Sequence, residues 1–181
     1  ARRMVALLRG INVGGNNMIP MARLRELMEG LGFDGIQTLL QSGNVVFTST
    51  SSPDVAATLI EEQLISQLGL RVRVFVRDGT ELATLVDGNP LADVAVDPAR
   101  YLVTFLSAKP DPDLLAGIDA QSFAPEIFRV GRREIFVWSP YGIRELRLNY
   151  AFWEKRLGVT ATARNWNTVT KLRALAAGRP Q

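Results

Sequence analysis

The order of apolar and polar positions in the first part of the chain predicts a short strand, a helix and a hairpin. Residues 5–8 form an apolar run that ends at a glycine-rich stretch, which is typical of a buried strand. Apolar residues then recur at spacings of three and four from Met21 to Leu31, which predicts an amphipathic helix that ends at Gly32. Two short apolar runs on either side of Ser42-Gly43-Asn44 indicate a β-hairpin.

The next segment completes a unit with the order β-α-β-β-α-β-α. Ser52 followed by Pro53 suits the start of a helix, and the apolar period continues to about Leu68, before Gly69. Residues 71–76 alternate polar and apolar, as a half-buried strand does, and residues 80–86 predict a short helix.

The second half of the chain repeats this order after a connection rich in glycine, proline and aspartate. It is predicted to contain strands over 101–106, 127–130, 134–138 and 160–164, and helices over 111–118, 146–157 and 167–177. Since β-α-β-β-α-β is the ferredoxin-like motif, we expect an α+β protein of two tandem ferredoxin-like subdomains with mostly antiparallel sheets. The first subdomain is predicted at 1–88, the connection at 89–98 and the second subdomain at 99–181.

The amino-acid composition excludes several kinds of chemistry but says less about the fold. The 181 residues include 47% apolar and 22% charged residues, as in a folded globular protein, but no Cys and no His. This excludes disulfides, Cys/His zinc sites, thiol nucleophiles and His general bases, so we expect no metal site and no cofactor. No segment resembles an export signal or a membrane span, which predicts a cytoplasmic protein without a membrane partner.

Positive charge is concentrated in the last third of the chain. Residues 1–128 contain 10 Lys/Arg and 15 Asp/Glu, a net charge of −5, whereas residues 129–181 contain 11 and 3, a net charge of +8. Such a region can attract the phosphate groups of nucleic acid or of a small anionic ligand. The alternative is an arginine-rich surface that is simply solvated.

Three polar segments are candidates for ligand binding. Their candidate residues are Arg9, Asn12, Gly14 and Gly15 in the first, Gln41, Ser42 and Asn44 in the second, and Arg164, Asn165, Trp166, Asn167 and Thr168 in the third. In the ferredoxin-like topology the first two strands point the same way, so the first two segments are expected at one end of a sheet. Whether the third segment joins them is left open by the sequence.

Each segment also has a purely structural interpretation. The glycines of the first can cradle a phosphate with backbone amides, or they can serve a turn that needs positive φ angles. In the second, Gln41 and Asn44 offer amide groups to a ligand, while Gly and Asn are also the ordinary residues of a hairpin turn. In the third, Trp166 and Arg164 offer surfaces for stacking a base, yet Asn165 or Asn167 can cap the last helix while Trp166 packs in the core.

The remaining candidates are expected to be structural. Trp138 and Trp153 fall on core faces, and Glu61 and Glu62 are predicted on the solvated face of their helix. The aspartates of Asp111-Pro112-Asp113 suit the start of a helix better than a metal site.

The strings LLRGINVGGNN, PMARLRELMEGLGF, QSGNVVF and ATARNWNTVTKL resemble a bacterial family catalogued as domain of unknown function 1697. The resemblance implies a two-part α+β fold and importance for the candidate residues of all three segments, together with Gly43. It implies no activity. This chain departs from the family pattern at Leu146-Arg147-Leu148, where a Ser-Lys-Leu is usual, and at Ala163, where a Thr is usual.

Three functions follow as hypotheses. The first is binding of nucleic acid or a nucleotide-like anion, based on the basic last third and on residues 164–168. The second is an enzyme that acts on a small polar substrate through amides, arginine and backbone donors. The third is a protein-interaction module that pairs through a sheet face or edge. The oligomeric state does not follow from the sequence.

Overall fold

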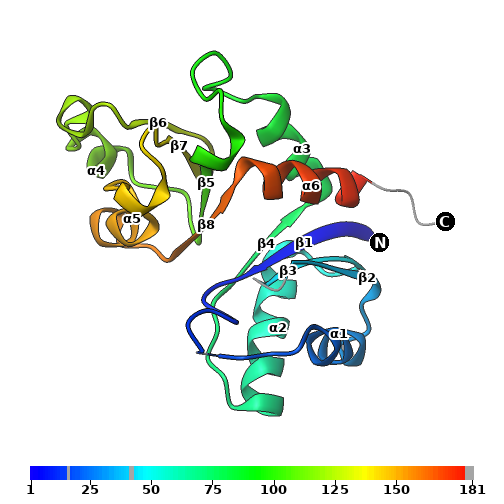
Figure 1. Ribbon diagram of the computed structural model, residues 1–181. Coiled ribbons are helices and arrows are strands. Elements are labelled where there is room, and N and C mark those ends of the chain that lie inside the picture. Colours follow the sequence, from blue (N-terminus) through cyan, green and yellow to red (C-terminus); the bar gives the residue numbers. More distant parts are fainter. Residues whose placement is uncertain (16, 41–42, 178–181) are drawn as a thin grey trace. The chain divides into compact units, whose positions relative to one another are not determined.

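The computed structural model describes residues 1–15, 17–40 and 43–177. It contains two four-stranded antiparallel sheets with their helices, which is the predicted α+β class (Figure 1). The chain divides into two compact units. The first consists of Ala1–Thr84 together with the chain from Lys171 on, and the second of Leu85–Thr170. The sequence had predicted the connection slightly later, at 89–98, and the whole last helix in the second subdomain.

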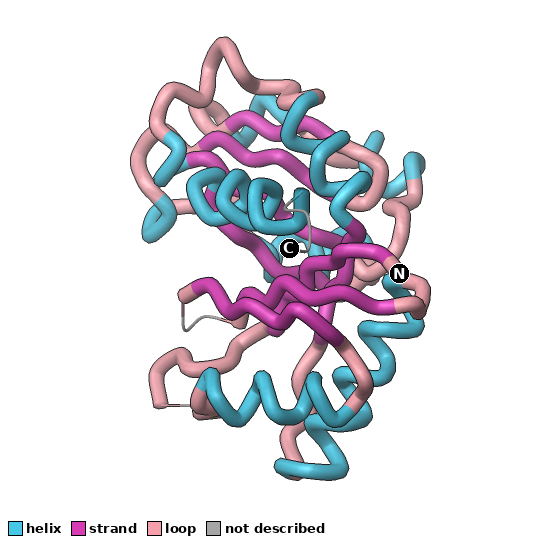
Figure 2. Tube along the Cα trace, turned by 90° about the vertical axis from the view of Figure 1, so that its right-hand side faces the viewer, coloured by secondary structure: helices cyan, strands magenta, loops and turns pink. Residues whose placement is uncertain are grey.

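The first unit is built around a sheet with the strand order β2-β3-β1-β4, in which each pair is antiparallel. Its strands are β1 (Arg2–Leu8), β2 (Asp34–Leu39), β3 (Asn44–Ser49) and β4 (Val74–Asp78), and its helices are α1 (Met21–Gly30) and α2 (Pro53–Leu68), with α3 (Gly79–Asp87) after β4. Helices α1 and α2 cover one face of the sheet in both views (Figures 1 and 2). Element order and strand order are consistent with the ferredoxin-like motif.

The alternation of side chains along β1 explains why this face is covered. Met4, Ala6 and Leu8 point to the same side of the sheet, and all three are fully buried in the core formed with α1 and α2. Helix α2 begins where Ser52 accepts the Val55 N–H at 3.3 Å, and it ends before Gly69. The predicted helix bounds are therefore confirmed here.

The second unit repeats the arrangement with the strand order β6-β7-β5-β8. It contains β5 (Tyr101–Leu106), β6 (Ile127–Val130), β7 (Glu134–Trp138) and β8 (Ala161–Asn165), the helices α4 (Pro112–Ala116) and α5 (Tyr150–Leu157), and the start of α6 (Trp166–Ala177), with 3-10 turns at Pro98–Arg100, Ala120–Phe123 and Ile143–Glu145. Trp138 and Trp153 are buried, as predicted from their core positions.

One predicted helix is wrong over its first part. The sequence predicted a helix over 146–157, but α5 begins at Tyr150. The carboxylate of Glu126 accepts the backbone N–H groups of Arg147 and Leu148, each at 3.0 Å, and holds this stretch in a non-helical path. Asn149 then caps α5 by accepting the Phe152 N–H at 2.9 Å.

The strand predicted over 71–76 begins only at Val74. Because β4 is the edge strand of its sheet, the Val74 N–H is not needed by a neighbouring strand, and it donates to Glu61 Oε2 at 3.0 Å. Glu61 is therefore half-buried against β4, and the prediction that it lies on a solvated helix face is wrong. Its neighbour Glu62 is exposed, as predicted.

None of the helices in the described part of the chain combines the length and the apolar character needed to cross a bilayer.

Candidate functional site

Two of the three polar segments meet at one end of the first sheet. The Leu8 N–H donates to the Gly43 carbonyl at 2.8 Å, and Leu7 lies opposite Asn44 in the sheet register. A Cβ atom on Gly43 would lie 2.9 Å from Ile11 Cγ1, and the residue has a φ of +83°. The hairpin turn therefore packs directly on the glycine-rich loop that follows β1, as the strand directions predict. Gln41 and Ser42 lie outside the described residues.

Asn12 holds the glycine-rich loop in shape. Its Nδ2 donates to the Ile19 carbonyl at 3.0 Å and its Oδ1 accepts the Ile19 N–H at 2.7 Å, so one side chain ties together two positions seven residues apart. Gly14 and Gly15 have φ angles of +58° and +79° and are exposed, with no atom within 4 Å of a Cβ built on either. Asn12 thus supports the loop, and the two glycines face open space.

Asn44 is also a supporting residue. It is fully buried, and its Nδ2 donates to the Leu39 carbonyl at 3.0 Å across the hairpin. An amide in this position stabilises the turn and is not accessible to a ligand.

Two arginines from distant parts of the chain lie side by side at this sheet end. The Arg9 N–H donates to the Arg73 carbonyl at 2.9 Å, which continues the antiparallel register of β1 and β4 past the pair Leu8 and Val74. Residues directly opposite in such a register project to the same face of the sheet. We call Arg9, Gly10, Gly14, Gly15 and Arg73 the sheet-end site.

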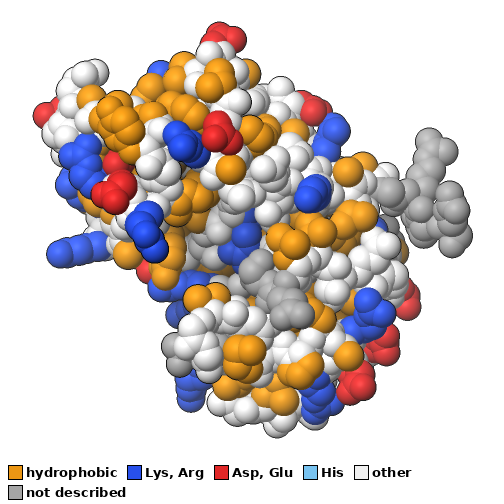
Figure 3. Space-filling model, viewed as in Figure 1, with side chains coloured by type: hydrophobic (Ala, Val, Ile, Leu, Met, Phe, Trp, Pro, Cys, Tyr) orange, Lys and Arg blue, Asp and Glu red, His pale blue; other side chains and the backbone are white. Residues whose placement is uncertain are grey.

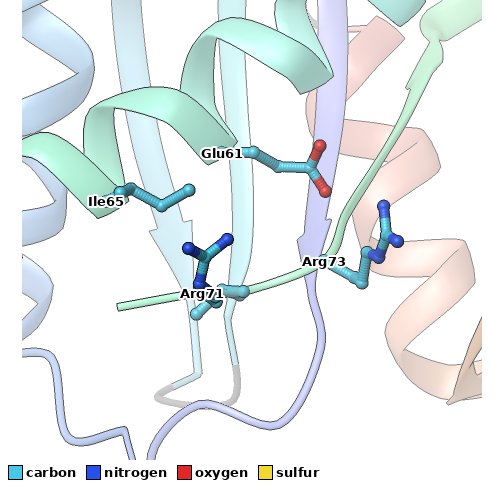
Figure 4. Close-up of a pocket in the computed structure, with 5 residues that line it drawn as sticks. Glu61, Ile65, Arg71 and Arg73 are labelled. Atoms are coloured by element: carbon cyan, nitrogen blue, oxygen red, sulfur yellow. The ribbon is translucent and has the colours of Figure 1, made fainter. Parts of the chain in front are cut away.

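A hollow of about 260 Å³ adjoins this site and shares Arg73 with it (Figure 4). Its lining comes from α2 and from the segment that leads into β4, and consists of Glu61, Ile65, Arg71, Val72 and Arg73. Arg71 and Arg73 are exposed, and neither guanidinium forms a hydrogen bond or ion pair with another described residue. Neither arginine is among the site residues predicted from the sequence. The pattern Arg71-Val72-Arg73, with an apolar residue between two arginines just before a strand, could have indicated them.

The third polar segment lies in the second unit, where several of its side chains serve the packing of that unit. Asn165 Oδ1 accepts the Thr168 N–H at 3.0 Å and caps α6, which is one of the structural roles considered for this segment. The Trp166 ring is half-buried, with its centroid 4.8 Å from that of Tyr101. Thr168 is buried and Asn167 is exposed.

Arg164 is held within its own strand. Its Nη1 donates to Thr162 Oγ1 at 2.8 Å and to the Ala163 carbonyl at 2.9 Å. Burial lowers the pKa of this guanidinium to about 10, since the charged form loses solvation. Burial likewise raises the pKa of Tyr101 to about 12, so its hydroxyl stays neutral and donates to Asn89 Oδ1 at 2.6 Å. Arg164 is therefore hydrogen-bonded within its own strand, and the Tyr101 hydroxyl is hydrogen-bonded within the second unit.

On the face shown in Figure 3, the described Lys and Arg side chains are scattered among apolar and uncharged ones. Arg147 is an example of a cation with a structural role. Its guanidinium donates to the Ser122 carbonyl at 3.0 Å and lies 3.5 Å from Glu126 Oε2. In the portion of the chain that the structure describes, no group of three or more acidic side chains is arranged to hold a metal ion.

Leu40, the residue that follows β2, has an unusual conformation. Its φ is +60° and its side chain is 57% exposed, although the left-handed region costs a branched residue about 1–2 kcal/mol. We expect Leu40→Gly to raise the free energy of unfolding by about 1 kcal/mol in urea denaturation, because glycine adopts this φ without strain. The control Leu39→Gly changes a strand residue with ordinary φ and should lower stability. Equal losses in both variants would contradict this interpretation of Leu40.

Comparison with known proteins gives a family and a fold. The model of a family described as protein of unknown function (DUF1697) matches residues 2–136. The chain is similar to the conserved bacterial protein SP0830 from Streptococcus pneumoniae, with a TM-score of 0.74 and 23% sequence identity over 97% of this chain and 98% of that one. At this identity the likeness establishes the fold alone. No curated protein has significant sequence similarity to the chain.

Proposed function

The chain belongs to the family of proteins of unknown function DUF1697, and from that premise we propose that it binds a small nucleotide-like anion at the sheet-end site of its first unit. The observation that carries this proposal is the pairing of Arg9 with Arg73. Both guanidinium groups can form charge-assisted hydrogen bonds with a bound anion.

The glycine-rich loop supports the same conclusion. Glycine allows close approach of the backbone to a phosphate, and Gly14 and Gly15 are exposed with open space around them. The Asn12 side chain fixes the base of the loop through its two hydrogen bonds to the Ile19 backbone. Asn12 therefore supports the loop and is not itself needed to bind the ligand. Exposed glycines in a loop that closely follows Arg9 in the chain can bring backbone amides to a phosphate group.

Two observations favour a small anion over an extended nucleic-acid strand. Trp166 packs against Tyr101 and Arg164 bonds within its own strand, so neither offers a free surface for stacking a base.

The test is isothermal titration with adenosine diphosphate at low salt. Hydrogen bonds to charged groups contribute about 1.5–3 kcal/mol, so we expect Arg9→Ala and Arg73→Ala each to weaken binding by roughly tenfold or more. The matched control is Arg25→Ala, which removes the same charge from an exposed position on α1 and should leave the affinity unchanged. Binding that is absent at millimolar ligand, or equally weakened by all three variants, would contradict the proposal.

A further inference from the structure

We infer that the hollow beside the sheet-end site takes the sugar of a phosphorylated sugar compound, whose phosphate is bound by Arg9 and Arg73. This inference rests on the proposed function and specifies the ligand class. The hollow and the site share Arg73, so a ligand with its phosphate on that arginine has its next group at the hollow. The chemistry of the lining decides what that group is.

Glu61 supplies an acceptor for sugar hydroxyls. Its Oε2 accepts the Val74 N–H at 3.0 Å, while Oε1 forms no hydrogen bond or ion pair with a described residue. An ionised carboxylate accepts about four hydrogen bonds in total, and a fixed carboxylate is a common partner for ribose hydroxyls in nucleotide sites. A bare inorganic anion gains nothing from this group and is repelled by it. The ligand must therefore present a hydroxyl donor here.

The arginines supply the complementary charge. Val72 lies between them in the sequence and is buried in the core of the first unit, whereas Arg71 and Arg73 are exposed. In Figure 4 the Arg71 side chain turns toward α2, and the Glu61 carboxylate lies between the two guanidinium groups in this view. The two guanidinium groups can donate hydrogen bonds to the phosphate and hydroxyl oxygens of a sugar phosphate, and the Glu61 carboxylate can accept hydrogen bonds from its hydroxyls.

Size and apolar surface agree with a single sugar. The volume of about 260 Å³ is below the roughly 300–1,000 Å³ of sites for drug-sized ligands, which excludes a dinucleotide from the hollow itself. Ile65 is 41% exposed and forms an apolar wall against which the C–H groups of a sugar ring can pack. Ribose 5-phosphate is the simplest compound with these features.

Titration calorimetry with ribose 5-phosphate and with inorganic phosphate tests this inference. We expect the intact protein to bind ribose 5-phosphate at least tenfold more tightly than phosphate. Glu61→Gln keeps an acceptor for the Val74 N–H but replaces the second oxygen with a donor, and should remove most of that difference without weakening phosphate binding. Arg71→Ala should also reduce it, and the control Glu62→Gln, one residue along α2 and exposed, should not.

The outcomes separate the two proposals. Phosphate binding that depends on Arg9 and Arg73, with no gain from the sugar or no effect of Glu61→Gln, overturns the inference and leaves the anion site standing. Failure of both compounds to bind, or binding that is indifferent to Arg9→Ala and Arg73→Ala, overturns the anion site and the inference together.

Discussion

Replacing Trp166 with alanine is expected to lower the free energy of unfolding by about 3 kcal/mol and to leave anion binding unchanged. Truncation of a packed tryptophan usually costs about 3–5 kcal/mol, and the lower end applies because this ring is only half-buried. The loss comes from the contacts with Tyr101 and Phe136, whose ring centroids lie 4.8 Å and 6.4 Å away. Urea denaturation gives the stability, and titration with adenosine diphosphate gives the affinity.

Trp166→Phe is the matched control, because it keeps an aromatic ring against Tyr101 and should restore most of the stability. The interpretation of this segment as structural fails if Trp166→Ala leaves stability intact and weakens ligand binding instead. That pattern would favour a base-stacking role for residues 164–168.

Glu126→Ala is expected to destabilise the protein by about 3–5 kcal/mol. The carboxylate is buried, accepts two backbone N–H groups and lies 3.5 Å from Arg147 Nε, so its removal leaves buried donors without their acceptor. Urea denaturation followed by circular dichroism measures the loss.

The control for Glu126→Ala is Glu145→Ala, which removes an exposed glutamate from the same unit and should change stability by less than about 0.5 kcal/mol. Similar stabilities for the two variants would show that Glu126 does not hold the 146–149 segment. Glu126→Gln should fall between them, since it keeps one acceptor oxygen for the two backbone donors.

Much of the fold follows from local periodicity. The strands over 101–106, 127–130 and 134–138 were predicted at the bounds observed, because alternation and turn residues specify them within a few positions. The start of α5 was predicted wrongly, because the acceptor that stops the helix is Glu126, more than 20 residues earlier in the chain. The apolar periodicity of residues 146–149 contains no information about a side chain so far away in the sequence.

The candidate site was predictable to a similar degree. Strand directions alone predicted that the loop after β1 and the hairpin would meet, and the contact of Gly43 with Ile11 follows from that topology. The pairing of Arg9 with Arg73 was not predicted, since the bounds given to the strand over 71–76 did not specify its register with β1. The choice between a binding and a structural role for Asn165 and Trp166 depended on contacts with neighbouring elements.

The most direct measurement of the central claim is a titration of the isotope-labelled protein with adenosine diphosphate, followed by two-dimensional amide NMR spectra. Binding at the sheet-end site predicts saturable shifts that are largest for the amides of Gly10, Gly14, Gly15 and Arg73, and that vanish in Arg73→Ala. Largest shifts at residues 164–168, or no saturable shift in the first unit, would contradict it.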